Sequence, residues 1–555
     1  MTASAATAPQ IPQGLMQHDV PLALDLVLQR LRTVAARGTV VTAAPDGTRT
    51  RATYADVAAR CDRLAAALAG LGVVPGDRVG TLQWNTQAHL EAYLAIPCMG
   101  AVLHTLNLRL FADQLAWIIN HAEDRVILVD GSLTPLLARS AGVLDKLEHV
   151  VVIGEPAAPL DGLRAAVHDY ETLLAAAPER FTWPALEERQ AAALCYTSGT
   201  TGDPKGVLYS HRSTILHSLA VLTADALAIA ARDRVMPVVP MFHANAWGIP
   251  YACALSGGGL VLPGPDLSPP ALARLIEEER VTLAAGVPTI WSGMLQHLSG
   301  TDADLSSLRL IVAGGAAVPE SLIRAFRDRL GLRLMQAWGM TETSPVASVA
   351  APVYEWDAEE AWPQRIATGR VCPLVDLRLV GGDDEEVPWD GESTGEVEVR
   401  GPWIAAAYYR VGADAERFHD GWLRTGDIAS VDPDGFMRIT DRAKDVIKSG
   451  GEWISSVALE NRLMGHDSVA EAAVIAMPDE QWSERPLACV VLRDGDPLDV
   501  EELRRHLAEA VAGWQVPDAF AVIDEVPKTS VGKFDKKRLR AALADGELEV
   551  VRAGG

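Results

Sequence analysis

The sequence predicts an α/β protein with a large N-terminal domain of layered α/β subdomains and a small, mobile C-terminal α+β domain. Short aliphatic and β-branched runs, such as residues 125–130, 149–154 and 308–315, predict strands. They alternate with longer amphipathic stretches of helical periodicity, such as residues 54–71. The length of 555 residues also exceeds what one hydrophobic core normally serves, so we expect at least two domains.

We place the domain boundary at the polar, turn-forming residues 441–444. This gives a large domain of residues 1–441 and a small domain of residues 442–555. The first fifteen or so residues are low in complexity and predict a mobile arm. Apolar runs in the small domain predict two strands and one helix of its own, at residues 471–477, 487–492 and 500–511.

The composition is typical of a soluble cytoplasmic enzyme. Hydrophobic residues make up 49% of the chain and charged residues 22%. No apolar stretch approaches the roughly 20 residues that a membrane helix requires, and the N-terminus does not resemble a secretory signal. The cysteines lie far apart with no C-x-x-C pair, so we expect them to be buried in a protein of a reducing compartment. They are Cys61, Cys98, Cys195, Cys253, Cys372 and Cys489.

The formal net charge of −24 argues against nucleic acid as a partner, because that binding depends on a basic surface. Any other polyanionic ligand is repelled by the same overall charge, so local basic clusters must attract it. One such cluster stands near the C-terminus, with a single acid, Asp535, among its members. Its basic residues are Lys528, Lys533, Lys536, Lys537, Arg538 and Arg540.

Residues 196–206, YTSGTTGDPKG, have the composition of a polyphosphate-binding loop. Glycines let backbone amides approach an anion, hydroxyls donate hydrogen bonds and a lysine supplies charge. The Walker pattern does not fit, because Asp203 and Pro204 separate Gly202 from Lys205. The alternative is an ordinary solvated turn. The residues concerned are Thr197, Ser198, Gly199, Thr200, Thr201, Gly202, Lys205 and Gly206.

Residues 336–345, QAWGMTETSP, form a second candidate motif. Trp338 can stack on a purine, Thr341 can bind a phosphate, and the Glu342 carboxylate can hold Mg²⁺. The alternative is a helix cap beside a buried ring.

Together these two segments resemble the phosphate loop and the adenine-and-metal motif of the adenylate-forming superfamily, which includes acyl-CoA synthetases, luciferases and peptide-synthetase adenylation domains. The resemblance extends from about residue 22 to residue 543, with Trp338 where a tyrosine is usual. It implies that ATP, Mg²⁺ and coenzyme A are bound, and that the chain is a homodimer. The implied metal ligands are Thr197 and Glu342, and the implied ATP contacts include the phosphate loop, Gln336, Ala337, Trp338 and Thr341.

Residues 313–319, AGGAAVP, resemble the segment whose backbone lines the adenine and the acyl group. The small residues Gly314, Gly315 and Ala316 allow a planar ligand to lie close to the chain. The resemblance places Gly314 and Gly339 beside the acyl group. The alternative interpretation is a tight strand-to-helix turn.

Two further motifs flank the predicted boundary. In RTGDIA, residues 424–429, Asp427 resembles the carboxylate that accepts both ribose hydroxyls, a task that suits an ionised acid. In residues 441–455 the resemblance places Arg442 near the ribose or phosphate and makes Lys444 the hinge of the small domain. Lys448 and Trp453 match positions near the phosphates and the path of coenzyme A. A glycine turn and a basic strand are the structural alternatives.

Residues 526–540, VPKTSVGKFDKKRLR, carry Lys533 after a glycine. The resemblance makes Lys533 the lysine that enters the active site when the adenylate forms. Attack of a carboxylate on a phosphate brings two anions together, so a mobile ammonium and Mg²⁺ lower that barrier. We interpret Lys536, Lys537 and Arg538 as a solvated basic helix.

Residues 238–251, VVPMFHANAWGIPY, resemble fatty acyl-CoA synthetases more than other members, and residues 448–456 agree. His243 takes the position expected next to the reacting carboxylate. Trp247 matches a tryptophan that gates the fatty-acid tunnel, although core packing is an equal alternative.

The sequence thus predicts an ATP-dependent acid:CoA ligase for a medium- or long-chain fatty acid. It first forms an acyl-adenylate with release of pyrophosphate, and coenzyme A then displaces AMP. Between the steps the small domain swings about Lys444 and replaces Lys533 with the turn at residues 450–452. Alternatives are a short, branched, sulfur-containing or aromatic acid, or loading of a carrier protein. A silent nucleotide-binding protein is disfavoured, because Lys533, Glu342 and Asp427 are all present.

Overall fold

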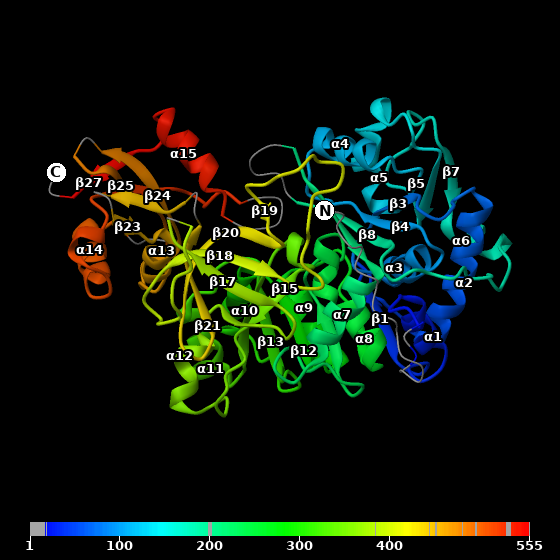
Figure 1. The fold of residues 1–555 in the computed structure, drawn as a ribbon, viewed down its shortest axis with the longest axis horizontal. Coiled ribbons are helices and arrows are strands. Elements are labelled where there is room, and N and C mark those ends of the chain that lie inside the picture. Colours follow the sequence, from blue (N-terminus) through cyan, green and yellow to red (C-terminus); the bar gives the residue numbers. More distant parts are fainter. Residues whose placement is uncertain are drawn as a thin grey trace, which may run out of the picture.

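The computed structural model describes residues 17, 19–197, 203–382, 384–442, 445–449, 452–479, 481–493, 497–528 and 534–553, with the backbone alone at 452 and 453. The predicted arm lies outside these residues. Figure 1 shows an N-terminal α/β region in blue and cyan, a green and yellow central region, and a C-terminal unit in orange and red. The predicted α/β class is confirmed.

A seven-stranded sheet forms the N-terminal region (Figure 1), and all neighbouring strands are parallel except the last pair. Helices α2, α3 and α6 pack on one face, and α4 and α5 pack on the other. The strands, in spatial order, are β7 (Ala166–Asp169), β6 (His149–Ile153), β5 (Val126–Asp130), β3 (Arg78–Leu82), β4 (Val102–Thr105), β8 (Ala191–Tyr196) and β9 (Gly206–Ser210). The helices are α2 (Tyr54–Gly70), α3 (Gln87–Cys98), α4 (Ala112–Ala122), α5 (Thr134–Ala138) and α6 (Tyr170–Ala176).

A fourteen-stranded sheet has a parallel half whose edge is closed by one antiparallel strand, β2 (Arg49–Thr53). Its parallel strands are β1 (Thr39–Ala43), β11 (Gly259–Leu262), β10 (Arg234–Pro237), β12 (Leu283–Gly286), β13 (Leu310–Gly314) and β14 (Leu334–Gly339). Helices α9 (Pro269–Glu279), α10 (Pro288–Leu298) and α11 (Glu320–Leu330) share a core with one face. The other face shares one continuous core with the seven-stranded sheet, through α1 (Asp25–Arg32), α7 (His211–Leu222) and α8 (Ile249–Ser256).

The second half of this sheet is antiparallel, and it brings distant motifs together. Its strands are β15 (Val346–Val349), β16 (Gly369–Val371), β21 (Phe436–Arg442), β20 (Trp422–Val431), β18 (Gly395–Arg400) and β17 (Asp376–Val380), with β19 (Phe418–His419) beside β20. A short helix, α12 (Trp362–Arg365), precedes β16. Strands β20 and β21 pair Asp427 with Arg442. The register of one hairpin therefore sets two predicted site residues side by side.

The C-terminal unit has its own six-stranded sheet, covered by α13 (Ser456–Met464) and α14 (Val500–Ala508) on one face and α15 (Lys536–Ala544) on the other. The strands are β22 (Ile447–Ser449), β23 (Glu452–Ile454), β24 (Val469–Asp479), β25 (Ser483–Leu492), β26 (Ala519–Val522) and β27 (Val550–Arg552). The strands expected at 471–477 and 487–492 lie within β24 and β25. The exact division at residues 441 and 442 stays a prediction.

Lys536 corrects one expectation. Its side chain is only 9% exposed and pairs with the buried Glu460, so the first turn of α15 is not a solvated basic surface. The lysine run alone cannot show which member faces a neighbouring helix. Lys537 and Arg538, by contrast, are exposed as expected.

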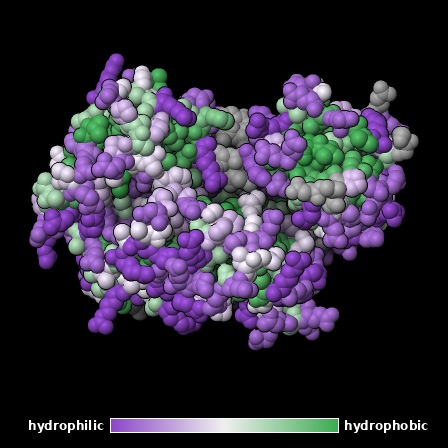
Figure 2. Space-filling view, turned by 180° about the vertical axis from the view of Figure 1, so that it is seen from behind, coloured by the Kyte–Doolittle hydropathy of each residue, from purple (hydrophilic) through white to green (hydrophobic). Residues whose placement is uncertain are grey.

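The surface and core agree with the composition. Seen from behind, polar side chains cover most of the large region, and hydrophobic ones gather over the C-terminal unit at the upper right (Figure 2). All six cysteines are buried and unpaired, as expected. Among the described residues no helix is both long and apolar enough to cross a membrane.

Gly369 begins β16 with φ +116°, and a Cβ there would lie 2.2 Å from the backbone carbonyl carbon of Val349. We predict that Gly369→Ala lowers the free energy of unfolding by about 2 to 4 kcal/mol, because backbone atoms cannot move aside cheaply. The control Gly142→Ala adds a Cβ that meets no described atom within 4 Å. Denaturant unfolding measures both variants, and equal stabilities would contradict the prediction.

Candidate functional site

Several predicted site residues lie outside the described residues, so their roles stay predictions. For Trp453 only the backbone is described. The others are Ser198, Gly199, Thr200, Thr201 and Gly202 of the phosphate loop, the hinge residue Lys444, and Lys533.

The described ends of the phosphate loop are fixed between β8 and β9. The backbone N–H of Thr197 donates to the carbonyl of Lys205 over 2.9 Å, and the Lys205 N–H donates to the Thr197 hydroxyl over 3.1 Å. The Lys205 ammonium donates to Asp414 over 3.1 Å and lies 4.6 Å from the centre of the Tyr408 ring. The phosphate-loop lysine is therefore neutralised by a carboxylate in this structure.

Glu342, the predicted metal ligand, is a buried carboxylate just beyond the end of β14. Its Oε1 accepts a hydrogen bond of 2.6 Å from the Tyr408 hydroxyl and lies 3.7 Å from a terminal guanidinium nitrogen of Arg417. Its backbone carbonyl accepts from the N–H of Ala405 over 2.8 Å. The neighbouring Thr341 is also buried, and its carbonyl accepts from Tyr209 over 2.7 Å. These contacts hold the Glu342 carboxylate beside an arginine.

Asp427 joins the adenine motif to the boundary region. Its Oδ2 accepts a hydrogen bond of 2.9 Å from the indole N–H of Trp338, and its Oδ1 lies 3.1 Å from Nε of Arg442. The charge of Asp427 is the main cause that raises the pKa of the Arg442 guanidinium above its ordinary value. The carboxylate predicted to bind ribose is thus oriented from both sides, by residues 89 and 15 positions away along the chain.

The small residues of β13 and β14 are required by close packing. Strand pairing sets Ala313 opposite Gln336 and Gly314 opposite Ala337. A Cβ on Gly314 would lie 2.5 Å from the carbonyl oxygen of Ala337 and 3.1 Å from the Trp247 ring. The strand-to-helix turn that we gave as the alternative follows: Gly315 has φ +84°, and Ala316 is exposed.

Gly339 at the end of β14 is packed against backbone, since an added Cβ would lie 1.7 Å from the Pro345 carbonyl oxygen. That contact explains its small size without an acyl ligand. Its expected place beside the acyl group stays a prediction.

Trp247 lies on a backbone turn that L-amino acids rarely adopt. Ala244, Asn245, Ala246 and Trp247 have φ of +42°, +51°, +47° and +58°, and Gly248 follows at +73°. Left-handed conformations at non-glycine residues cost roughly 1 kcal/mol or more each, and they persist where a function or the surrounding packing demands them. The strain therefore points to a constraint on where the Trp247 ring lies, against Gly314.

Buried polar groups hold this turn in place. The Asn245 side-chain oxygen accepts hydrogen bonds from the Tyr93 hydroxyl and the Cys195 thiol, each over 3.3 Å. Tyr93 also donates to the carbonyl of Met241. His243, the last residue before the turn, is half-buried.

Three site residues were missed from sequence: Tyr408, Asp414 and Arg417. All three lie in the segment that connects β18 to β19. The aromatic pair Tyr408–Tyr409, followed by charged residues just before the RTGDIA motif, is the signal that could have marked them. Lys448, which we did predict, is exposed on β22. Within the described part of the chain no contact joins it to Tyr408, Asp414 or Arg417.

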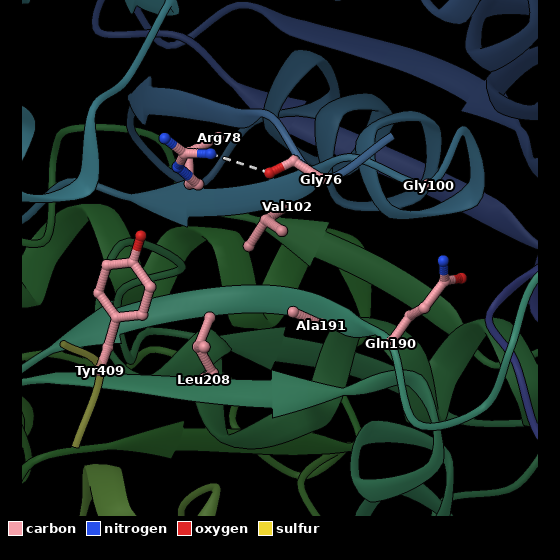
Figure 3. Close-up of a pocket in the computed structure, with 8 residues that line it drawn as sticks. All are labelled: Gly76, Arg78, Gly100, Val102, Gln190, Ala191, Leu208 and Tyr409. Atoms are coloured by element: carbon pink, nitrogen blue, oxygen red, sulfur yellow. Dashed lines mark hydrogen bonds between the residues drawn. The ribbon is translucent and has the colours of Figure 1, made fainter. Parts of the chain in front are cut away.

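A cavity of about 190 Å³ lies elsewhere, at the other end of the parallel strands (Figure 3). Arg78, Val102 and Ala191, the first residues of β3, β4 and β8, line it, whereas the phosphate loop follows the last residue of β8. The Arg78 guanidinium donates to the Gly76 carbonyl over 3.0 Å, as Figure 3 shows. We assign the cavity no part in the candidate site.

Comparison with known proteins places these features in one family. The model of the AMP-binding enzyme family matches residues 31–409, and that of the AMP-binding enzyme C-terminal domain matches residues 458–533. The 3-methylmercaptopropionyl-CoA ligase of Ruegeria lacuscaerulensis is 44% identical, over 95% of this chain and 98% of that protein. The long-chain-fatty-acid–CoA ligase of Thermus thermophilus is 48% identical, over 92% and 94%.

Solved structures agree over most of the chain. The anthranilate CoA ligase AuaEII in complex with anthranoyl-AMP has a TM-score of 0.86 at 27% identity, covering 96% of this chain and 100% of that one. ATP-bound MatB from Rhodopseudomonas palustris has a TM-score of 0.80 at 26% identity, covering 94% and 99%.

We predict that Trp338→Phe raises the KM for ATP about fivefold, the loss of roughly 1 kcal/mol for one hydrogen bond, because Phe keeps an aromatic face but cannot orient Asp427. Trp362→Phe is the control, since its indole N–H also donates to a carboxylate, Glu320, and neither residue is among the proposed site residues. Initial-rate kinetics measure both. An unchanged KM in Trp338→Phe would show that this bond does not support nucleotide binding.

Proposed function

The chain belongs to the AMP-binding enzyme family, and we propose that it is the acid:CoA ligase expected from the sequence, acting on a medium- or long-chain fatty acid. Relatives named as medium-chain and long-chain fatty-acid ligases, at 43% and 48% identity, support this choice. A sulfur-containing acid is the second candidate, supported by the 3-methylmercaptopropionyl-CoA ligases at 44% and 46%. Homodimerisation and a cytoplasmic location remain parts of the proposal.

One observation carries the nucleotide assignment: three cations of the site are each paired with a carboxylate. Lys205 pairs with Asp414, Arg417 with Glu342, and Arg442 with Asp427. A triphosphate brings several negative charges, and it can take over Lys205 and Arg417 from their carboxylates. We therefore add Arg417 to the residues proposed to bind phosphate.

The proposed residues also fit a magnesium ion. Within the described part of the chain no group of three or more acidic, His or Cys side chains could hold a metal by itself. Mg²⁺ in nucleotide sites is commonly held by one or two carboxylates together with substrate phosphates, and Glu342 with the Thr197 hydroxyl would provide the protein ligands. The ion would neutralise phosphate charge.

The proposed reaction has two displacements. In the first, a carboxylate oxygen of the acid bonds to the α-phosphorus of ATP, and the bond to pyrophosphate breaks. Lys205, Arg417 and Lys533 offset the charge that accumulates, while Asp427 and Trp338 position the nucleoside. In the second, the thiol sulfur of coenzyme A bonds to the acyl carbon, AMP leaves and the thiol proton passes to solvent.

The acid would enter beside Trp247. Its ring packs on Gly314, and the strained turn limits where it can go. We propose that this ring sets the length of acid accepted and that His243 lies near the reacting carboxylate.

The direct test supplies a panel of acids to the wild-type enzyme and to Lys533→Ala, and follows AMP release with ATP and coenzyme A. We expect release with medium- and long-chain acids by the wild type. We also expect Lys533→Ala to lose adenylate formation by about a hundredfold or more while it still converts supplied acyl-AMP to the thioester. Absence of acid-dependent AMP release for every acid would contradict the proposed function. Equal loss of both half-reactions would contradict the role of Lys533.

For Trp247→Ala we predict a changed chain-length preference with ATP affinity within about twofold of the wild type, because the indole lies on the acyl side of the site. Trp247→Leu refills part of the volume that Trp247→Ala leaves empty. Comparing the two variants separates the effect of the ring on acid preference from its effect on core packing. Substrate profiles and thermal melts are measured on the same samples. If Trp247→Ala merely loses the ~3 to 5 kcal/mol typical of an emptied aromatic site and keeps its acid preference, Trp247 is a packing residue.

A further inference from the structure

Lys536 is a buried cation that the proposed reaction does not use. It is the first residue of α15, and its ammonium lies 2.6 Å from Oε1 of Glu460 and donates to the Ser456 hydroxyl over 2.7 Å. Glu460 and Ser456 both belong to α13 and are buried. Lys536 thus ties the beginning of α15 to α13.

Asp441 extends this network into the large sheet. It is the penultimate residue of β21, is fully buried, and accepts hydrogen bonds at Oδ2 from the Ser456 backbone N–H (2.5 Å) and hydroxyl (2.7 Å). Ser456 is the first residue of α13, so Asp441 places a negative charge at that helix N-terminus, where it is favourable. The contact joins strands of one sheet to a helix of the other unit, across the predicted hinge at Lys444.

A second ion pair lies on the C-terminal side of the predicted hinge. Arg540, one turn further along α15 from Lys536, pairs with Asp445, which lies directly after the hinge position. Helix α15 therefore contacts Asp445, after the hinge, directly and reaches Asp441, before the hinge, through Ser456. A rotation about residue 444 would have to break at least the Asp441 contacts.

These groups are costly to separate. Burial raises the pKa of both Asp441 and Glu460 above its ordinary value, and the charge of Lys536 opposes that rise. Without Lys536, two buried carboxylates would face each other with no cation between them. The Lys536 ammonium therefore stabilises the network that it forms with Asp441, Ser456 and Glu460.

The same helix start fixes the chain next to Lys533. Lys533 lies three positions before Lys536, so the two Cα atoms are at most about 11 Å apart. The residues that flank the segment 529–533 are also fixed to each other. Lys528 and Phe534 form an antiparallel bridge, and the Asp535 N–H donates to the Pro527 carbonyl over 2.7 Å. The position of the first residue of α15 therefore limits the positions that Lys533 can reach.

We propose that Lys536 is a positioning residue, and that Asp441, Ser456, Lys536 and Glu460 form a latch across the hinge that holds the small domain in the orientation for adenylate formation. The latch must open at Asp441 before thioester formation. This inference rests on the proposed function, because it assigns the latched orientation to the first half-reaction.

The test compares Lys536→Met with the double variant Lys536→Met/Glu460→Gln, which also removes one buried carboxylate charge and so guards against misfolding. Lys537→Met, an exposed neighbour on the same helix, is the matched control. Adenylation is followed by acid-dependent exchange of pyrophosphate into ATP, and thioester formation by adding coenzyme A to supplied acyl-AMP. We expect both Lys536 variants to lose adenylation kcat about tenfold to a hundredfold, with the KM for ATP and the second half-reaction within about threefold of wild type. Lys536→Arg should recover part of the loss.

A second readout does not depend on activity. Arg442 and Lys444 are trypsin sites at the hinge, so opening of the latch should speed cleavage there in Lys536→Met and in Asp441→Asn, relative to Lys537→Met. Equal loss of both half-reactions, wild-type adenylation, or unchanged cleavage would each overturn the latch. Absence of exchange in the wild type with every acid would instead overturn the proposed function.

Discussion

The organisation of the site follows from one electrostatic constraint: a chain with a net charge of −24 has to bind a polyanion. In the proposed function, local cations meet this constraint, and each is paired with a carboxylate in the structure. Lys205 contacts Asp414, and Arg442 contacts Asp427, at N–O distances of 3.1 Å in both pairs. These pairs hold positive groups in place, and in the proposed function the incoming phosphates take over Lys205, and Arg417 beside Glu342, from their carboxylates.

Backbone topology brings these groups together. The pairing of β20 with β21 sets Asp427 against Arg442, the pairing of β13 with β14 packs Gly314 on Ala337, and the segment before β19 carries Tyr408 and Arg417 to Glu342. Beyond β21 the chain enters the C-terminal unit, where Ser456 of α13 contacts Asp441 before the predicted hinge and Arg540 of α15 contacts Asp445 after it. Arg442, a residue of the proposed nucleotide site, lies two positions before the predicted hinge at Lys444, so the site and the hinge adjoin along the chain.

Much of this was predictable because it depends on short motifs and on periodicity. Alternating strand and helix patterns predicted the α/β class, and the resemblance to the adenylate-forming superfamily, together with residue chemistry, singled out Trp338, Glu342 and Asp427. The hydrogen bond between Trp338 and Asp427 could not be foreseen, since it depends on sheet register across 89 positions. Arg417 carries no motif, the burial of Lys536 depends on a helix 80 residues away, and the left-handed turn at Trp247 contradicts ordinary backbone preference.

The central claim is that local cations, rather than overall charge, govern nucleotide binding. The most direct measurement is the Kd for ATP at constant Mg²⁺ as sodium chloride rises from about 50 mM to about 500 mM. If the paired cations dominate, salt screens their attraction for phosphate, and the affinity falls steadily. If the net charge dominates, the same salt screens its repulsion, and an affinity that rises with salt would contradict the account.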